Sequence, residues 1–255
     1  MMRPIFLLIF CTSCLQAQKL FPQLEGQALL DALREKYQPE RLLSYASAKD
    51  VLYADIYLEK DSIHCVYSGH SLYLDPTQDP SKWLYKDGSN DGINCEHLWP
   101  KSRGIKGTRA ETDLHHLVPT RVAVNQARSN LPFDEVPDRE TKQWYFQSFG
   151  RNSIPADYLI DQYSELGATA FEPREDFKGN VARALFYIYT MYQDEIDAVD
   201  PQFFADQLPV LCQWHKQDPV DEAERKRSLL IAQYQDNKAN PYILFPELVG
   251  RAFCN

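Results

Sequence analysis

Several well-known patterns of catalytic and cofactor sites are missing from this chain of 255 residues. It contains no His-Glu-x-x-His segment, which a zincin places on one helix, and no His-x-Glu with Pro-Cys-x-x-Cys, which a zinc deaminase requires. A Walker A loop and a dinucleotide-binding glycine fingerprint are also missing. These absences argue against zinc peptidases, zinc deaminases and enzymes built around a nucleotide cofactor.

Long apolar runs, internal repeats and glycine-serine linkers are missing after the first residues. At the start, a basic residue precedes the apolar run 5–10, and small and polar residues follow up to Ala17. This pattern predicts a signal peptide over 1–17, cleaved before Gln18. A lipoprotein anchor at Cys14 is the second interpretation, because residues 11–13 form a poor lipobox. We therefore expect a secreted or periplasmic, monomeric protein without a membrane segment, whose residues 18–255 form one domain.

An excess of positive charge is also missing, because the net charge is −9 and the pI is about 5.2. The charge is nevertheless uneven. Residues 94–130 contain six Lys and Arg but three Asp and Glu, a local charge of +3, so the rest of the chain carries −12. A locally basic surface can bind phosphates, whereas an acidic remainder argues against tight storage or wrapping of DNA. The distribution indicates transient contact with a nucleic acid.

Two short segments within this basic region carry the chemistry. The segments 94–100 (NCEHLWP) and 113–119 (DLHHLVP) are predicted strands, and Thr120 is a candidate N-cap for a helix that follows. This strand, loop, strand and helix would bring His97 close to Asn125. The Glu96 carboxylate and the Asn125 amide offer hard oxygen ligands for Mg²⁺, and the His97 imidazole can remove a proton from water. Those parts suit metal-assisted hydrolysis of a phosphodiester.

The same segments resemble a known family. NCEHLWPKSRG followed by DLHHLVPTRVAVNQARSNLPF is similar to the endonuclease I family of secreted bacterial nucleases, which are His-Me finger (ββα-metal) nucleases. The likeness covers roughly residues 40 to 250, including FEPREDFKGNVARA and WHKQDPV. It implies that Glu96 and Asn125 hold one divalent metal, Mg²⁺ first and Mn²⁺ or Ca²⁺ as alternatives, and that His97 is the general base. The implied substrate is DNA, with RNA as a second candidate, cleaved with little sequence specificity.

Other residues of the segments have less defined roles. Asp113 and one of His115 and His116 are expected to support the site, with hydrogen-bonded structural residues as the alternative. Arg128 lies near Asn125 on the predicted helix and is read as a phosphate clamp, with a structural ion pair as the alternative. The remaining phosphate-binding candidates are Lys101, Arg103 and Lys106.

Two further alternatives concern the same region. Cys95, His97, His115 and His116 could instead form a structural zinc site. The whole domain could also be a non-catalytic nucleic-acid-binding or adhesion module that keeps the fold without the chemistry. The intact Glu96, His97 and Asn125 favour the enzyme.

The balance of predicted elements gives an α+β fold class: a mostly helical single domain around a ββα-metal motif at about 94–130. Helices are predicted over 27–37, 175–194, 201–216 and 220–235. Four cysteines follow the signal peptide. We expect the pairs Cys65–Cys95 and Cys212–Cys254, which stay within the two halves of the chain, with reduced thiols as the alternative.

Overall fold

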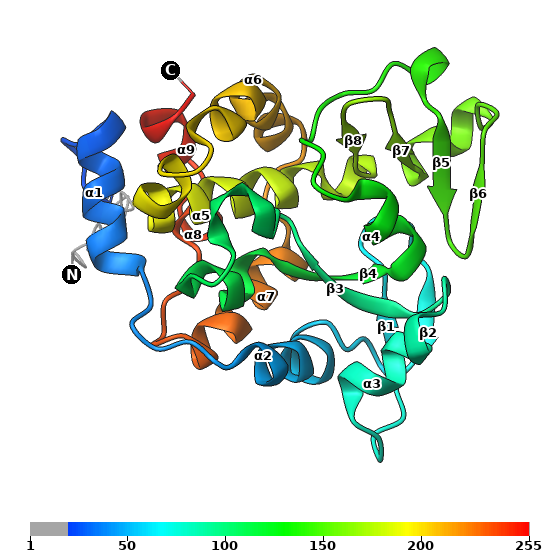
Figure 1. Cartoon of the computed structure of the whole chain (residues 1–255). Helices are drawn as coiled ribbons and strands as arrows, with labels where there is room; N and C mark the ends of the chain where they lie inside the picture. The colour runs from blue at the N-terminus through cyan, green and yellow to red at the C-terminus, as the bar shows by residue number, and fades with distance from the viewer. Residues whose placement is uncertain (1–19, 255) are drawn as a thin grey trace, which may run out of the picture.

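Two long helices, α5 (Lys178–Asp197) and α6 (Pro201–Gln217), pack against each other at the centre of the fold (Figure 1). Both confirm helices predicted from apolar residues at helical spacing. That spacing places one set of α5 side chains inside the main core, where each is at most 1% exposed. This set consists of Val181, Leu185, Ile188 and Tyr192.

The structure, a computed structural model, describes residues 20–254. The expected signal peptide over 1–17, its cleavage site and the alternative anchor at Cys14 lie outside these residues. Within the described part of the chain, no helix combines the length and the apolar character needed to cross a membrane.

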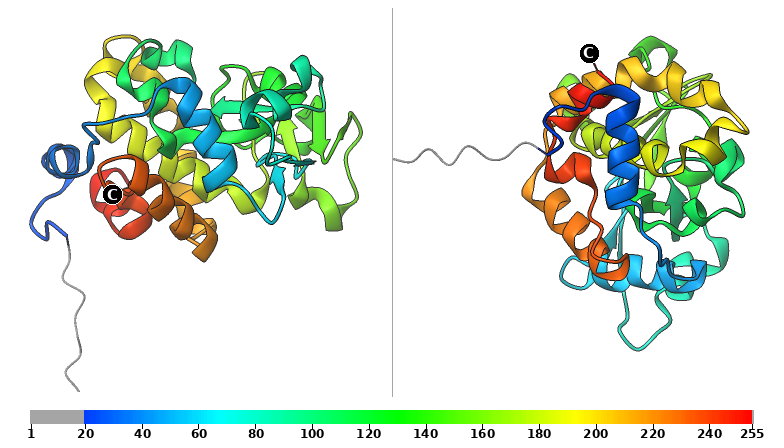
Figure 2. Two further views of the ribbon diagram at one scale, coloured as in Figure 1. Left: turned by 90° about the horizontal axis from the view of Figure 1, so that it is seen from below. Right: turned by 90° about the vertical axis from the view of Figure 1, so that its left-hand side faces the viewer.

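The remaining larger helices surround this pair. α1 (Gly26–Tyr37) packs on α5 at one end of the molecule, and the last of three C-terminal helices lies beside α1 (Figure 2). These helices are α7 (Glu222–Tyr234), α8 (Pro241–Leu244) and α9 (Leu248–Ala252). Two shorter helices, α2 (Tyr45–Val51) and α3 (Pro80–Tyr85), pack against each other.

The strands form three small antiparallel sheets, so the α+β prediction is confirmed. The four-stranded sheet, in the order β6-β5-β7-β8, lies at the end of the molecule opposite α1 (Figure 1). Its strands are β5 (Gln143–Phe146), β6 (Phe149–Arg151), β7 (Ser164–Leu166) and β8 (Phe171–Glu172). A second sheet pairs β1 (Ser62–His64) with β2 (Ser71–Tyr73).

The third sheet is the hairpin that the motif predicted. β3 (Ile93–His97) pairs with β4 (Leu117–Arg121), and α4 (Val122–Arg128) follows β4 directly. In this register Glu96 lies opposite Val118, and His97 lies opposite Leu117. The ββα order is therefore present over 93–128.

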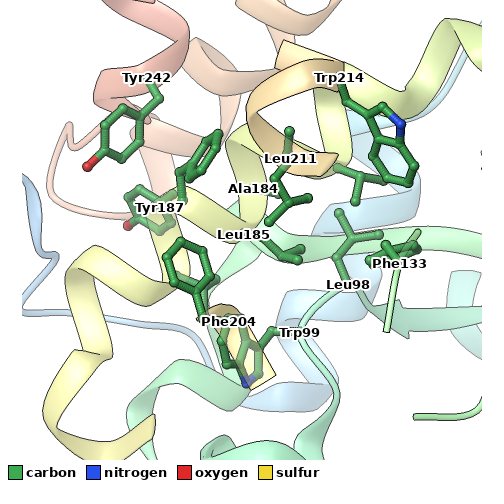
Figure 3. Close-up of a cluster of buried hydrophobic side chains, with 14 of the residues drawn as sticks. Leu98, Trp99, Phe133, Ala184, Leu185, Tyr187, Phe204, Leu211, Trp214 and Tyr242 are labelled. Carbon is green, nitrogen blue, oxygen red and sulfur yellow. The ribbon is translucent and has the colours of Figure 1, made fainter. Parts of the chain in front are cut away.

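The hairpin is anchored by the two residues that follow His97. Leu98 and Trp99 are at most 1% exposed and pack among side chains of α5 and α6 (Figure 3). The Trp99 indole N–H donates to the carbonyl oxygen of Arg103 at 2.8 Å. Because burial of such a large aromatic residue is strongly favourable, the end of β3 is fixed to the helical core.

Three details of the predicted motif were wrong. β3 ends at His97 rather than at Pro100, and residues 114–116 form a single 3₁₀ turn rather than strand. β4 also continues past Pro119, whose carbonyl accepts from Val66 on the edge away from β3. The missing N–H of Pro119 therefore points away from the ladder and costs no bond with β3. As a result Thr120 lies inside β4, and Arg121 is the N-cap of α4.

The two faces of the hairpin pack into different apolar clusters. Ile93, Cys95 and Leu117 meet a second core formed with α2 and α3, whereas Val118 faces the main core with Cys65. This separation follows from the alternation of side chains along a strand.

The separation of the two apolar clusters also explains which cysteines form a disulfide. Cys212 and Cys254 form a disulfide with a Cα–Cα distance of 5.7 Å, as predicted, which ties α6 to the C-terminal segment. Cys65 and Cys95 are free thiols on opposite sides of the hairpin, so the predicted Cys65–Cys95 bond was wrong.

Candidate active site

A cleft of about 880 Å³ runs along the edge of β3 that does not pair with β4. Because the cleft follows an edge, neighbouring residues of the strand reach it although their side chains alternate between two faces. Its walls come from α2, α3, α4 and the turn 101–106. The strand contributes Asn94, Cys95, Glu96 and His97, and α4 contributes Asn125, Gln126 and Arg128.

Glu96 is a buried carboxylate, 4% exposed, at the base of this cleft. Its Oε1 lies 3.0 Å from Nη1 of Arg128 and 3.4 Å from the hydroxyl of Tyr67. Burial raises the pKa of Glu96 to about 7, although the Arg128 charge opposes this shift. A cation in the cleft would favour the ionised form of this carboxylate.

Asn125 enters the cleft from α4, with its amide held in one orientation. Its Nδ2 donates to Oδ1 of Asn94 at 2.8 Å and to the carbonyl of Cys95 at 3.4 Å. Both bonds use the amide nitrogen, so the amide oxygen is left as an acceptor. Asn94 lies two residues before Glu96 on β3 and therefore shares its face. The strand thus orients Asn125 while presenting Glu96.

His97 is held by one ring nitrogen. Its Nε2 lies 2.9 Å from the carbonyl oxygen of Glu111, and because a carbonyl only accepts, Nε2 carries the proton. Nδ1 is therefore the basic nitrogen of the neutral ring. The Tyr45 ring packs beside the imidazole, with 5.5 Å between ring centres. Burial lowers the pKa of His97 to about 4, so the ring is neutral at neutral pH.

Arg128 does not have the free guanidinium that a phosphate clamp needs. It is 0% exposed, and besides Glu96 it donates to the carbonyls of His97 at 3.1 Å and Leu98 at 2.7 Å. Its guanidinium carbon also lies 4.5 Å from the centre of the Phe133 ring. The structure therefore favours the alternative of a structural ion pair, because these contacts hold the end of α4 against the end of β3, where Glu96 lies.

Asp113, His115 and His116 lie behind the cleft and do not line it. Asp113 accepts from the hydroxyls of Tyr187 and Tyr192 and from the side chain of Gln235, and it caps the 3₁₀ turn. It therefore fixes the turn to α5 and α7.

The two histidines diverge from that turn. The His115 ring bonds the carbonyl of Lys238 and packs on Tyr187, away from the cleft. His116 bonds the carbonyl of Ala110 and packs edge-on against His97, with 5.3 Å between ring centres. Of the two, only His116 therefore supports the imidazole of His97 by contact.

The zinc alternative finds no support in this arrangement. Within residues 20–254, no three carboxylate, imidazole or thiol groups converge in a way that could hold a metal ion. The ring nitrogens of His97, His115 and His116 bond three separate carbonyls. A carboxylate and an amide oxygen, Glu96 and Asn125, are instead the donor types that suit a hard divalent cation. They fit Mg²⁺, which keeps several waters and takes further oxygens from a phosphate substrate.

Only some of the predicted phosphate-binding cations lie in the cleft. Lys101 and Lys106 are exposed and line the cleft. Arg103 does not line it, because its guanidinium pairs with Asp200 at 2.7 Å and lies over the Phe203 ring. The assignment of Arg103 to the phosphate site therefore lacks structural support.

Several site residues were missed by the sequence reasoning. Lys49 of α2 and Lys82 of α3 line the cleft from segments outside 94–130. Tyr67 and the Glu111 carbonyl hold Glu96 and His97, but neither carries a local sequence signal. Asn94 could have been found, since a strand places it on the face of Glu96.

Known proteins similar to the chain are nucleases. An extracellular ribonuclease of Bacillus amyloliquefaciens is 31% identical over 234 residues, which cover 87% of this chain and 72% of that protein. An extracellular ribonuclease of Bacillus subtilis (strain 168) is 31% identical over 223 residues, covering 74% of this chain and 71% of the relative. Endonuclease-1 of Buchnera aphidicola subsp. Baizongia pistaciae is 27% identical over 163 residues, 64% of this chain and 55% of that protein.

The Endonuclease I family itself matches residues 25–247. This range contains both strands of the hairpin, α4 and every residue that lines the cleft. The resemblance seen in the sequence motifs is thereby confirmed. The chain belongs to the endonuclease I family, and it is a nuclease that hydrolyses phosphodiester bonds.

Proposed function

We propose that this protein is a metal-dependent endonuclease that cleaves DNA and RNA with little sequence specificity. One observation carries the proposal: a neutral imidazole with its basic nitrogen free shares one cleft with a carboxylate and an oriented amide. These groups are His97, Glu96 and Asn125. An imidazole and two hard oxygen donors are the parts that metal-assisted hydrolysis of a phosphodiester requires.

His97 is the general base of the proposed reaction. Its Nδ1 accepts a proton from a water molecule as that water attacks phosphorus, and the P–O bond to the departing strand end breaks. The Glu111 carbonyl keeps the proton of the ring on Nε2, so Nδ1 stays available throughout. The departing oxygen then takes a proton from solvent. General-base assistance of this kind typically contributes about 10²–10⁴-fold to the rate.

Glu96 and Asn125 are the proposed ligands of one divalent metal, Mg²⁺ before Mn²⁺ or Ca²⁺. A bound ion of this kind would supply positive charge to the phosphoryl and leaving oxygens. Arg128 compensates part of the Glu96 charge and fixes the carboxylate in place. Asn94 orients the amide of Asn125. His115 and Asp113 serve the site indirectly, by holding the turn that carries His116.

The side chains that line the cleft and the names of the relatives both bear on which polymer this nuclease cleaves. The cleft is lined by lysines, which suit phosphates, and phosphate contacts carry little sequence information. Two relatives are named ribonucleases and one is named an endonuclease, which supports a substrate range including RNA. Extracellular relatives support the expectation that residues 1–17 are a signal peptide and that the protein is secreted. The remaining domain, 18–255, is proposed to act as a monomer.

A cleavage assay tests the proposal. Purified protein should nick supercoiled plasmid DNA and degrade RNA in the presence of Mg²⁺, and EDTA should abolish both activities. His97→Ala, prepared in the same way, controls for a contaminating nuclease. If the protein bound nucleic acid but cleaved neither polymer at any divalent metal, it would be the non-catalytic binding module instead.

A further inference from the structure

We propose that Tyr85 is a stacking platform for an unpaired base next to the scissile phosphate, so that single-stranded nucleic acid is the preferred substrate. The inference rests on the proposed function, and it assigns a nucleotide-binding subsite to α3. Nothing in the motif at 94–130 indicates this subsite, because α3 lies outside that segment.

Tyr85 is an exposed aromatic residue of the cleft. It is the last residue of α3, is 45% exposed and lines the same cleft as Glu96 and His97. The preceding residue, Leu84, is 0% exposed in the second core, so the helix that carries Tyr85 is firmly packed. A large aromatic ring left open in a cleft, on a fixed element, is suited to contact with a ligand.

The backbone after Tyr85 forms a left-handed turn that brings Gly88 against the Tyr85 ring. Lys86 and Asp87 both have positive φ, 48° and 53°, and Gly88 follows with φ 82°. Lys86 in this conformation is the C-cap of α3, so the chain turns sharply directly after Tyr85. A Cβ on Gly88 would lie 3.1 Å from the Tyr85 hydroxyl, so the ring rests on a residue without a side chain.

The charges around Tyr85 suit a nucleic-acid strand. Lys82, one turn earlier on α3, has a side chain that is 85% exposed and lines the cleft. Lys49 and Lys106 line it from α2 and from the turn 101–106. Among the described residues, Glu96 is the one carboxylate that lines the cleft. Lysines that follow a backbone and an aromatic ring that accepts a base are the two components of single-strand binding.

A base can stack on Tyr85 only when one of its faces is free. Inside a duplex both faces of each base are covered by neighbouring pairs, so unstacking must come first. In a single strand the face is available without that cost. Stacking does not read the 2′-hydroxyl, so the subsite should serve DNA and RNA strands equally.

Steady-state cleavage of a short labelled oligonucleotide, single-stranded and as its duplex, tests the subsite. Tyr85→Ala should raise KM for the single strand by about 5- to 150-fold, the usual range for loss of one base stack, with kcat changed only a few-fold. Tyr85→Phe keeps the ring and should behave as wild type. Tyr158→Ala is the matched control, because Tyr158 is 83% exposed but does not line the cleft.

An unchanged KM in Tyr85→Ala, or an equal rise for the duplex, would overturn the stacking subsite. Failure of the wild-type protein to cleave either oligonucleotide would instead refute the proposed function. In that case the subsite is still tested by fluorescence anisotropy with the same labelled strand. Weaker binding by Tyr85→Ala than by Tyr158→Ala supports the subsite, and equal binding refutes it.

Discussion

Replacing Arg128 distinguishes two roles that a cation beside Glu96 can have. A phosphate clamp would be required for cleavage and not for folding, whereas a structural arginine would be required for folding first. The guanidinium is fully buried and has four polar partners, the Glu96 carboxylate and the carbonyls of His97, Leu98 and Ser129. These contacts join the end of α4 to the end of β3, which carries Glu96 and His97, so we expect the folding role to dominate.

The expected magnitudes follow from those partners. Arg128→Met leaves the Glu96 carboxylate buried without its cation, and breaking a buried pair in this way costs about 3–5 kcal/mol. At about 2–4 °C per kcal/mol for a domain of this size, Tm should fall by about 6–20 °C. Arg128→Lys keeps the charge but not the planar fork. It should lose at least one charge-assisted hydrogen bond, about 1.5–3 kcal/mol.

Thermal unfolding followed by circular dichroism measures these losses, and single-turnover cleavage well below both Tm values measures the chemistry. Arg103→Lys is the matched control, because the Arg103 side chain is 32% exposed and makes one short contact, with Asp200. Its loss of stability should be smaller than that of Arg128→Lys. An Arg128→Lys protein with the wild-type Tm and a much lower cleavage rate would refute the structural role and restore the phosphate clamp.

Three further predictions concern the base, the metal ligands and the disulfide. His97→Ala should lower kcat by about 10²–10⁴-fold with little change in metal affinity. In the wild-type protein at saturating metal, kcat should decrease only as the pH falls towards 4, where His97 becomes protonated. A decrease of kcat centred near pH 6.5 would contradict this assignment. Glu96→Ala and Asn125→Ala should each weaken Mg²⁺ binding measured by calorimetry, and unchanged binding in both would place the ligands elsewhere. Reducing Cys212–Cys254, separated by 42 residues, should destabilise the protein by about 4 kcal/mol and lower Tm by about 8–16 °C, and an unchanged Tm after verified reduction would contradict this.

The local parts of the site could be read from the sequence. The hairpin and the helix within 94–130 follow from short apolar segments and helical spacing, which depend on neighbouring residues. The same holds for α5, where the apolar residues Val181, Leu185, Ile188 and Tyr192 recur every three or four positions and are buried. The chemistry of Glu96, His97 and Asn125 could be predicted because it depends on residue type as much as on position.

Features set by distant contacts could not be predicted in the same way. Helical spacing places Arg128 near Asn125, but its direction is set by the carbonyls of β3 and by Phe133. Residues 114–116 have a strand-like sequence pattern but form a turn. The reason is that Asp113 is held by Tyr187 and Tyr192, more than 70 positions away.

The free cysteines are a further example. Proximity in sequence favoured a bond between Cys65 and Cys95, whereas the hairpin places the two thiols on opposite faces. The walls formed by α2 and α3 were missed for a related reason: the cleft collects side chains from segments that no local pattern connects to β3.

Burial acts on the two central ionisable groups in opposite directions, with one useful and one costly result. It lowers the pKa of His97 and raises that of Glu96, because the charged form of each group is disfavoured away from water. A neutral imidazole is what a general base needs, so for His97 burial alone suffices. A metal ligand must be ionised, so Glu96 needs nearby positive charge. Arg128 supplies part of this charge within the fold, and a divalent cation would supply the rest. Two adjacent buried residues can therefore serve as a metal ligand and as a general base, provided that the compensating positive charge lies next to Glu96.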